Sequence, residues 1–312
     1  MDRGSSARPW LVTGATGLLG ANAMHALQAA GIPAVGVARR PPDRDDVIAV
    51  DLLDESARRD VVERLRPSTI LHAAALADIE ACERDPDLAR RMNVEAAEAL
   101  AREGDALGAR FIHISTDAVF DGRRGGYRVD ETTSPTHVYG ATKAESEHAV
   151  LDTVPSALVA RVDFFGWSPS GRRSLAEFFH RGLVAGDVMR GFTDVRVSTL
   201  HVGHLIGALR ALSARSVDGI QHVTARDSVS KYDFGRRLAL RFGFDPNLIR
   251  PARSRDVLVV ARGSDISLDT TATATRLGSE LPTVQDGLDE LHREFERGVP
   301  QLIRDWHPKE TT

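Results

Sequence analysis

The chain has a single cysteine, Cys82, among 312 residues. One cysteine forms no internal disulfide and supplies no multi-cysteine metal cluster, and no pair of its histidines has the spacing of a metal site. Cys82 also lacks an adjacent cationic motif that would activate its thiolate. We therefore expect a reducing compartment, no bound metal and an inert thiol.

Long apolar runs and an excess of one charge are also missing. No stretch of about eighteen apolar residues occurs, and residues 1–10 lack the apolar segment of a signal peptide, which predicts a cytoplasmic protein. A formal net charge of −4 gives no reason to expect nucleic acid or an anionic membrane as a partner. The expected partner is a small molecule.

Short apolar runs alternate with longer amphipathic stretches from Trp10 onward. This pattern predicts an α/β protein, a Rossmann-like doubly wound parallel sheet with helices on both faces. The expected strands are residues 10–13, 34–37, 47–50, 69–73, 110–115 and 157–162. The expected helices between them are residues 18–30, 55–65, 87–107 and 138–151.

The alternation weakens after Arg161. Glycine, arginine and aromatic residues interrupt it, and prolines punctuate the tail. We expect a first domain at residues 8–165 and, at 166–312, mainly a smaller carboxy-terminal lobe that is partly interleaved with the last elements of the sheet. Further helices are expected at residues 175–184, 204–212 and 232–242.

Three glycines, Gly14, Gly17 and Gly20, follow the first expected strand and open a helix. Glycine lets the backbone turn tightly and approach a pyrophosphate, which the N-terminus of the next helix attracts. The first domain is therefore expected to bind a dinucleotide and the lobe to bind the substrate. A glycine-rich turn packed under the sheet is the alternative. The residues expected to hold the cofactor here are Gly14, Thr16, Gly17, Leu18 and Leu19.

The second expected strand ends in Arg39 and Arg40. An acidic residue at this place binds the ribose 2′-hydroxyl of NAD, whereas arginine forms paired, charge-assisted hydrogen bonds with a 2′-phosphate. NADP(H) is therefore the expected cofactor, with NAD(H) as the alternative. The two arginines could instead simply begin a solvated charged loop.

Two further strand ends are candidate cofactor contacts. Asp51 and Leu52 follow the third strand, where a carboxylate can lie near the adenine amino group, although Asp51 or Asp54 could equally cap the next helix. Small side chains follow the fourth strand, where a backbone must lie close to a flat ligand or simply packs tightly. These are Ala73, Ala74 and Ala75.

Tyr139 and Lys143 lie four residues apart on an expected helix, so that their side chains share one face. A nearby ammonium can lower the pKa of a phenol toward neutrality and fit it for proton transfer to a carbonyl oxygen. Thr116, or alternatively Ser115, ends the preceding strand and can hydrogen-bond that carbonyl. His72 and His113 lie within apolar strands and are interpreted as core residues.

With these motifs together, the chain resembles an extended short-chain dehydrogenase/reductase and, more narrowly, the dTDP-4-dehydrorhamnose reductases. The resemblance covers about residues 10–165. Its matching segments are Thr13-Gly-Ala-Thr-Gly-Leu-Leu-Gly20, His72-Ala-Ala-Ala75, Asn93-Val-Glu-Ala96, Ser115-Thr-Asp-Ala-Val-Phe-Asp-Gly122 and Ser134-Pro-Thr-His-Val-Tyr-Gly-Ala-Thr-Lys143.

The resemblance implies NADPH-dependent reduction of the 4-keto group of a nucleotide-linked deoxysugar, with Thr116, Tyr139 and Lys143 as the catalytic set, and a homodimer. Related dehydratases carry a glutamate after Thr-Asp, where this chain has Ala118, so dehydration is disfavoured. Two alternatives remain, a nucleotide-sugar epimerase with bound NAD and a non-catalytic regulatory subunit like that of methionine adenosyltransferase. The candidate substrate contacts are Ser115, Asp117, Phe165, Trp167, Arg172 and Arg196.

Overall fold

A seven-stranded parallel sheet forms the centre of the computed structural model, which describes residues 7–256 and 264–308. The strand order is β11-β6-β5-β4-β1-β2-β3. The predicted α/β fold class is confirmed. Six of the strands agree with the sequence prediction to within one residue at each end. The strands are β1 (Trp10–Thr13), β2 (Ala34–Ala38), β3 (Val47–Ala49), β4 (Thr69–His72), β5 (Arg110–Thr116), β6 (Leu158–Val162) and β11 (Gly219–His222).

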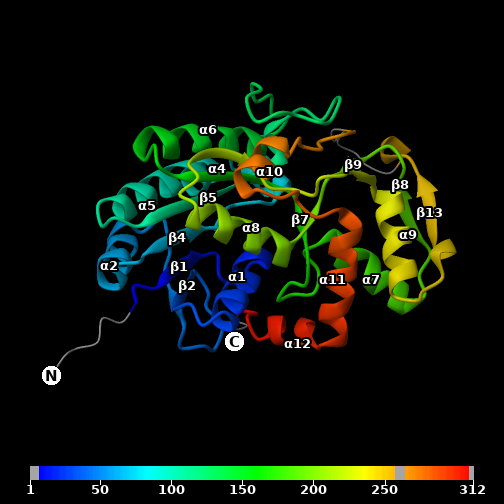
Figure 1. Ribbon diagram of the computed structural model, residues 1–312, viewed down its shortest axis with the longest axis horizontal. Helices are drawn as coiled ribbons and strands as arrows, with labels where there is room; N and C mark the ends of the chain where they lie inside the picture. Colours follow the sequence, from blue (N-terminus) through cyan, green and yellow to red (C-terminus); the bar gives the residue numbers. More distant parts are fainter. Residues whose placement is uncertain (1–6, 257–263, 309–312) are drawn as a thin grey trace.

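Helices cover both faces of the sheet (Figure 1). On one face α1 (Leu18–Ala29) packs beside α8 (Val202–Ala214), and on the other α5 (Ala96–Asp105) lies between α2 (Glu55–Leu65) and α6 (Val138–Thr153). Successive side chains of a strand point to opposite faces, so Leu11 and Val12 belong to two different apolar cores. This two-sided burial explains the near-continuous apolar strands of the sequence.

The helix expected at residues 87–107 is divided. It consists of α4 (Pro86–Arg90), a π-helical segment, η1 (Arg91–Glu95), and α5, with α3 (Ile79–Arg84) before them. The side chain of Asp85 accepts a hydrogen bond from the amide of Leu88 and caps α4, so a new helix begins there. A π-helical turn shifts the residues after it around the helix axis, which a regular 3.6-residue pattern does not reveal.

The carboxy-terminal part contributes a strand to the main sheet and forms a lobe beside it (Figure 1). β11 adds to the edge next to β6, with Gly219 paired to Leu158, and the sequence pattern did not predict it. The lobe pairs β7 (Phe164–Phe165) with β10 (Leu200–His201), β8 (Met189–Phe192) with β13 (Ile249–Ala252), and β9 (Arg196–Val197) with β12 (Val229–Ser230). The remaining helices are α7 (Leu175–Ala185), α9 (Lys231–Arg241), α10 (Thr271–Leu277), α11 (Val284–Glu296) and α12 (Val299–Arg304), with short 3-10 turns η2 (Asp117–Val119), η3 (Pro246–Leu248) and η4 (Ser254–Asp256).

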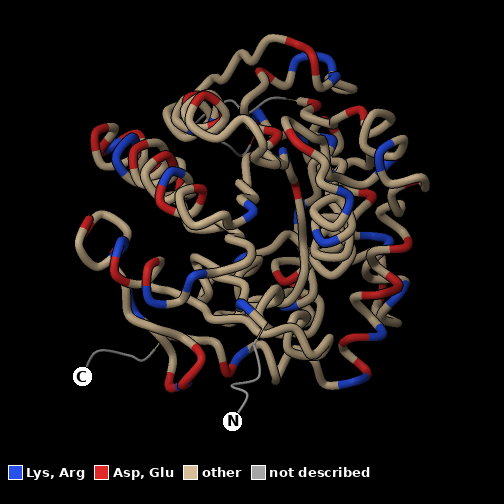
Figure 2. Tube along the Cα trace, turned by 60° about the vertical axis from the view of Figure 1, so that its left-hand side comes forward, with Lys and Arg blue, Asp and Glu red and all other residues tan. Residues whose placement is uncertain are grey.

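The lobe shares an apolar core with one face of the sheet. Buried residues of α7, α9 and α11 belong to the same cluster as those of α1 and α8. Basic and acidic residues are scattered together over the trace in Figure 2, in keeping with the small net charge. Within residues 7–256 and 264–308, no helix is long and apolar enough to cross a membrane.

Candidate active site

The glycine turn lies at the carboxyl end of β1, where the strand order reverses between β1 and β4 and sheets of this kind bind their ligands. Gly14 has a φ of 68°, and a Cβ atom there would lie 3.0 Å from the backbone of Ala74. A Cβ on Gly20 would overlap the carbonyl oxygen of Gly14. These glycines are therefore required by the tight packing of the turn itself, as the structural alternative held.

The same turn leaves the N-terminus of α1 open. No side chain caps this helix at Gly17, and its first turn contains no acidic residue. Amide groups and the positive end of the helix dipole are therefore free of an internal negative partner, an arrangement that suits a pyrophosphate. Thr16 and Gly17 are partly exposed at this turn, whereas the side chains of Leu18 and Leu19 are buried below it.

Arg39 and Arg40 follow β2 and are exposed. Neither forms a salt bridge with a residue that the structure describes. Asp51 is exposed after β3 and accepts a hydrogen bond from the amide of Leu53, 3.0 Å away, while Leu52 is buried. The cap of α2 is Asp54, so the capping role considered for Asp51 belongs to its neighbour.

Thr13 ties the ends of β1 and β4 together. Its hydroxyl accepts hydrogen bonds from the amides of Ala73 and Ala74, both 3.1 Å away, and lies 2.9 Å from Nδ1 of His72. Because the hydroxyl already accepts twice, it donates to Nδ1, which leaves His72 neutral. Burial and the charge of Lys143 also favour a neutral ring, since they lower the pKa of His72 to about 3. Ala73, Ala74 and Ala75 remain partly exposed beside the glycine turn.

Thr116 and Tyr139 meet where β5 ends and α6 begins. A Cβ on Gly140 would overlap the carbonyl oxygen of Ala118, so the absence of a side chain there lets α6 start directly against the end of β5. The Thr116 hydroxyl hydrogen-bonds the Tyr139 side chain. The amide of Ala118 donates to the same Thr116 oxygen over 3.2 Å, which holds it in place.

Lys143 lies one turn further along α6 and is 1% exposed. Its Nζ atom is 3.1 Å from Nε2 of His113, whose ring stacks on that of His72 with centroids 5.5 Å apart. Burial lowers the pKa of Lys143 to about 7, although the Glu147 carboxylate opposes this. The two histidines interpreted as core residues are indeed buried, but His113 also contacts the lysine of the site, which the strand pattern did not reveal.

The expected effect of Lys143 on Tyr139 is absent from this structure. Burial raises the pKa of Tyr139 to about 12, the Thr116 hydrogen bond lowers it, and the Asp117 charge raises it further. The reason is geometric, because the ammonium of Lys143 lies against His113 rather than beside the phenol. Tyr139 is thus held as a protonated phenol, a state that can donate a proton but not accept one.

Ser115 and Asp117 flank Thr116 and differ in their surroundings. The Ser115 hydroxyl donates to Glu147 over 2.5 Å, and Glu147 forms a buried salt bridge with Arg161 at 2.8 Å. Ser115 is therefore engaged below the site, and Thr116 is the hydroxyl that reaches Tyr139. Asp117 is 6% exposed and accepts a hydrogen bond from Thr116 at 3.1 Å.

The four candidate substrate contacts of the lobe fall into two groups. Phe165 and Trp167 are buried in its core, where Phe165 packs edge-on against Phe234 and the Trp167 indole nitrogen donates to the carbonyl of Leu291. Their aromatic character is explained by this packing, and neither side chain is available to a ligand in this arrangement. The other two are exposed arginines, and Arg196 binds Ser228 and Asp265 while Arg172 remains on the surface.

Asn93 links two parts of the site through the π-helical segment. Its amide oxygen accepts from the amide of Leu76 at 2.8 Å, and its amide nitrogen donates to the Leu76 carbonyl and to the Thr142 hydroxyl. The loop after β4 is thereby fixed to α6 beside Lys143. Asn93 thus supports the neighbourhood of the site.

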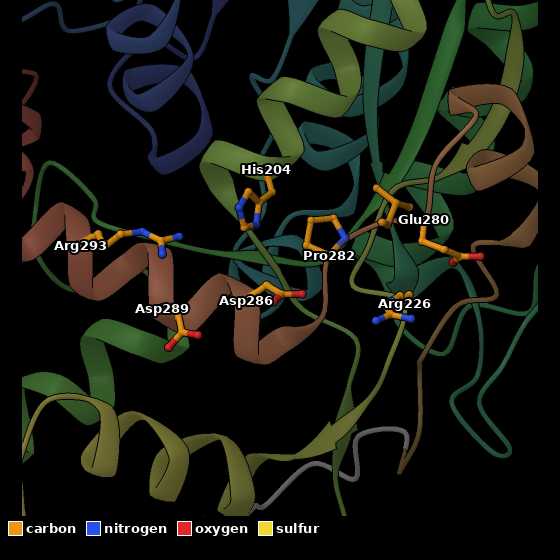
Figure 3. A pocket seen from close by; sticks show the side chains of 8 residues that line it. His204, Arg226, Glu280, Pro282, Asp286, Asp289 and Arg293 are labelled. Atoms are coloured by element: carbon orange, nitrogen blue, oxygen red, sulfur yellow. The ribbon is translucent and has the colours of Figure 1, made fainter.

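A cavity of about 490 Å³ lies in the carboxy-terminal half (Figure 3). None of the residues predicted from the sequence lines it. Three of its charged groups already have partners among the described residues, since Asp286 accepts from the amide of Thr283 in the capping box of α11, Asp289 pairs with Arg241 and Arg293 pairs with Glu290. Its lining residues are His204, Arg226, Glu280, Leu281, Pro282, Asp286, Asp289 and Arg293.

Three comparisons with known proteins found similar sequences and structures along most of the chain. A family model described as the RmlD substrate binding domain matches residues 8–297. A probable low-salt glycan biosynthesis reductase of Haloferax volcanii is 31% identical over 291 residues, covering 91% of this chain and 97% of that protein. The methionine adenosyltransferase 2 subunit beta of Pongo abelii is also 31% identical, over 87% of this chain and 84% of that protein. The crystal structure of dTDP-4-dehydrorhamnose reductase from Bacillus anthracis in complex with NADP matches with a TM-score of 0.83 at 23% identity, covering 93% of this chain and 100% of that chain.

Proposed function

The chain belongs to the family of the RmlD substrate binding domain, and we propose that it is an NADPH-dependent reductase of the 4-keto group of a nucleotide-linked deoxysugar. The observation that carries this proposal is the meeting of Thr116 and Tyr139 at the end of β5, one helical turn from Lys143. A phenol, a hydroxyl and an amine in this arrangement fit carbonyl reduction, which needs a proton donor and a group that orients the carbonyl.

The residues around the glycine turn fit the cofactor. The uncapped N-terminus of α1 would hold the pyrophosphate, and the exposed guanidinium groups of Arg39 and Arg40 would bind a 2′-phosphate. The small residues Ala73, Ala74 and Ala75 leave room for a flat ring near β4. When bound, NADPH supplies the hydride of the reduction. NADH remains the alternative cofactor.

The protein's own residues supply orientation and the proton. Thr116 is proposed to hydrogen-bond the substrate carbonyl, and Tyr139 to give its hydroxyl proton to the carbonyl oxygen. The high pKa of Tyr139, about 12, keeps the phenol protonated until negative charge develops on that oxygen. Lys143 is proposed to bind the nicotinamide ribose, for which its side chain must leave His113.

The substrate class rests on the relatives. A similar protein is named as a probable glycan biosynthesis reductase, and a similar structure is that of a dTDP-4-dehydrorhamnose reductase. Ala118 supports reduction over dehydration, because a methyl group offers no acid or base for the loss of water. Of the lobe residues, the exposed Arg172 and Arg196 remain candidates for the diphosphate. A homodimer is part of the proposal, by the family resemblance.

A second candidate function is that of a regulatory subunit. The identity of 31% to methionine adenosyltransferase 2 subunit beta favours it, because that protein is named as a subunit. Retention of Thr116, Tyr139 and Lys143 together supports catalysis instead. The two functions differ in an observable way, since only a reductase oxidises NADPH in the presence of a ketosugar.

The test is an assay of NADPH absorbance with a panel of nucleotide-linked 4-ketosugars, beginning with dTDP-4-dehydrorhamnose. The parent is expected to oxidise NADPH, and Tyr139→Phe to be slower by about 10²-fold or more, the usual contribution of a positioned proton donor. Tyr127→Phe is a matched control, because Tyr127 lies midway between β5 and α6, where its hydroxyl donates to Asp121 and its ring packs on Phe120. Equal rates for the parent and Tyr139→Phe would defeat the proposal.

A further inference from the structure

Two carboxyl groups lie side by side at the carboxyl end of the sheet. The register of β5 and β6 pairs Thr116 with Val162, so the next residues on the two strands are Asp117 and Asp163. The Oδ2 atom of each is buried and has no hydrogen-bond partner among the residues that the structure describes. Two such groups cannot both ionise cheaply, so an arrangement of this kind favours one shared proton.

The surroundings of the two carboxyl groups also favour a state in which the pair holds one proton. Burial first, and then the Asp163 charge, raise the pKa of Asp117 well above its ordinary value. Burial raises the pKa of Asp163 to about 6, although Lys231 at the start of α9 and a hydrogen bond from Thr199 lower it. Lys231 also acts on Asp117, and its single charge compensates for one carboxylate and not two.

A chain of hydrogen bonds joins this pair to the proposed proton donor. The Thr116 hydroxyl lies 3.1 Å from Oδ1 of Asp117 and also bonds the side chain of Tyr139. Thr116 thus stands between a carboxyl group and the phenol. Lys143, the other ionisable group of the site, is turned toward His113.

We propose that Asp117, which shares one proton with Asp163, returns a proton through Thr116 to Tyr139 after each reduction. This inference rests on the proposed function. Once Tyr139 has given its proton to the substrate oxygen, it is a phenolate. The Thr116 hydroxyl, which donates to Oδ1 of Asp117 in the structure, first turns its proton toward the phenolate, so that its oxygen accepts from the protonated Asp117. The Thr116 proton then moves to the phenolate oxygen while the Asp117 carboxyl proton moves to Thr116, which ends unchanged.

The step is balanced. Asp117 ends as a carboxylate, no electrons are exchanged, and a proton from water later restores the pair. A carboxylic acid is ordinarily a stronger acid than a phenol, and burial raises the pKa of both groups here, that of Tyr139 to about 12. Asp117 therefore acts through Thr116 and does not need to touch the substrate.

The kinetic test uses Asp117→Asn, which keeps the shape and the hydrogen bond to Thr116 but holds no transferable carboxyl proton. The full-length protein is mixed rapidly with NADPH and dTDP-4-dehydrorhamnose, and absorbance is followed through several turnovers. The first turnover is expected to stay within twofold of the parent, and later turnovers to be about tenfold slower than in the parent. Unchanged later turnovers, or equal slowing of all turnovers, would overturn the relay.

A spectroscopic test of the shared proton needs no substrate. Infrared difference spectra recorded as the pH crosses neutrality should show a protonated carboxyl band in the parent. Asp117→Asn and Asp163→Asn should each move the disappearance of the band to lower pH, because the remaining carboxyl group keeps its burial but no longer has a second carboxylate beside it. Asp60→Asn, on the exposed face of α2, should leave that pH unchanged. Absence of the band from the parent would refute the shared proton.

The two tests separate the possible failures. A parent that oxidises no NADPH on any ketosugar contradicts the proposed function, and the infrared band still reports on the carboxyl pair. An active parent in which Asp117→Asn turns over normally contradicts the relay alone. A fall in the melting temperature of Asp117→Asn together with equal slowing of all turnovers would indicate a structural role.

Discussion

The Nζ atom of Lys143 lies 3.1 Å from Nε2 of His113, inside the protein and away from water. His113 is fully buried, and burial together with the charge of Lys143 lowers its pKa well below the ordinary value. A neutral imidazole therefore faces an amine whose pKa is about 7. Burial of the lysine lowers this pKa, so that the amine is partly uncharged near neutral pH.

The first prediction concerns Lys143 and pH. Its pKa is about 7 in the folded protein and ordinarily 10.5. Between these values the unfolded chain binds one proton more, so the stability of the parent rises with pH relative to Lys143→Met. Between pH 7 and 9 we expect a relative gain of about 1–3 kcal/mol, from about 1.4 kcal/mol per pH unit. Denaturant unfolding of both proteins at each pH measures it.

The exposed Arg59→Met provides the control for this experiment. Its stability relative to the parent should not change between pH 7 and 9, because an arginine stays charged throughout. A difference between the parent and Lys143→Met that is equally independent of pH would show that Lys143 titrates near its ordinary value.

A second prediction concerns Arg39 and cofactor preference. If the guanidinium binds the 2′-phosphate, Arg39→Asp should reduce the preference for NADPH over NADH at least tenfold, because a charge-assisted hydrogen bond contributes about 1.5–3 kcal/mol. Dissociation constants of both cofactors, measured by fluorescence titration, report this directly. Arg59→Asp on α2 makes the same change of charge elsewhere on the surface and should leave the ratio unchanged. An unaltered ratio in Arg39→Asp would remove Arg39 from the cofactor site.

The sequence predicted the strand ends of the sheet well, because a polar, charged or small residue stands near the carboxyl end of each apolar run. Thr116 and Tyr139 are 23 positions apart, yet the order of strand and helix places them at one edge, and the structure brings them together. Local patterns succeed here because the βα unit fixes where a strand ends and the next helix begins.

The contacts that the sequence did not reveal depend on register between distant segments. Asp117 and Asp163 meet only because β5 and β6 pair as they do, and nothing near either residue indicates the other. Phe165 and Trp167 were expected to reach a substrate, but α11, which the sequence pattern did not predict, helps to bury both. An aromatic residue that follows a strand gives the same sequence pattern whether its side chain contacts a ligand or packs in the core.

A third prediction concerns the buried pair of Glu147 and Arg161, whose side chains are 0% and 3% exposed. Glu147→Gln leaves the guanidinium without its negative partner, so we expect a loss of about 3–5 kcal/mol in the free energy of unfolding. Glu145→Gln, two residues earlier and exposed, should change it by less than about 0.5 kcal/mol. Denaturant titration at pH 7 compares the three proteins. Equal stability of Glu147→Gln and the parent would contradict the prediction, because it would mean that the Arg161 guanidinium does not need the Glu147 carboxylate.

The last prediction compares two glycines within helices. A Cβ on Gly20 of α1 would overlap the backbone of Gly14, so Gly20→Ala must displace the glycine turn and should weaken NADPH binding at least tenfold and destabilise the fold by about 1–3 kcal/mol. A Cβ on Gly207 of α8 meets nothing within 4 Å, so Gly207→Ala should stabilise the protein by about 0.5–1 kcal/mol with unchanged binding. Calorimetric titration and thermal unfolding of both variants measure these effects. Normal NADPH binding by Gly20→Ala would contradict the required close packing, since the added methyl group has no room unless the turn moves.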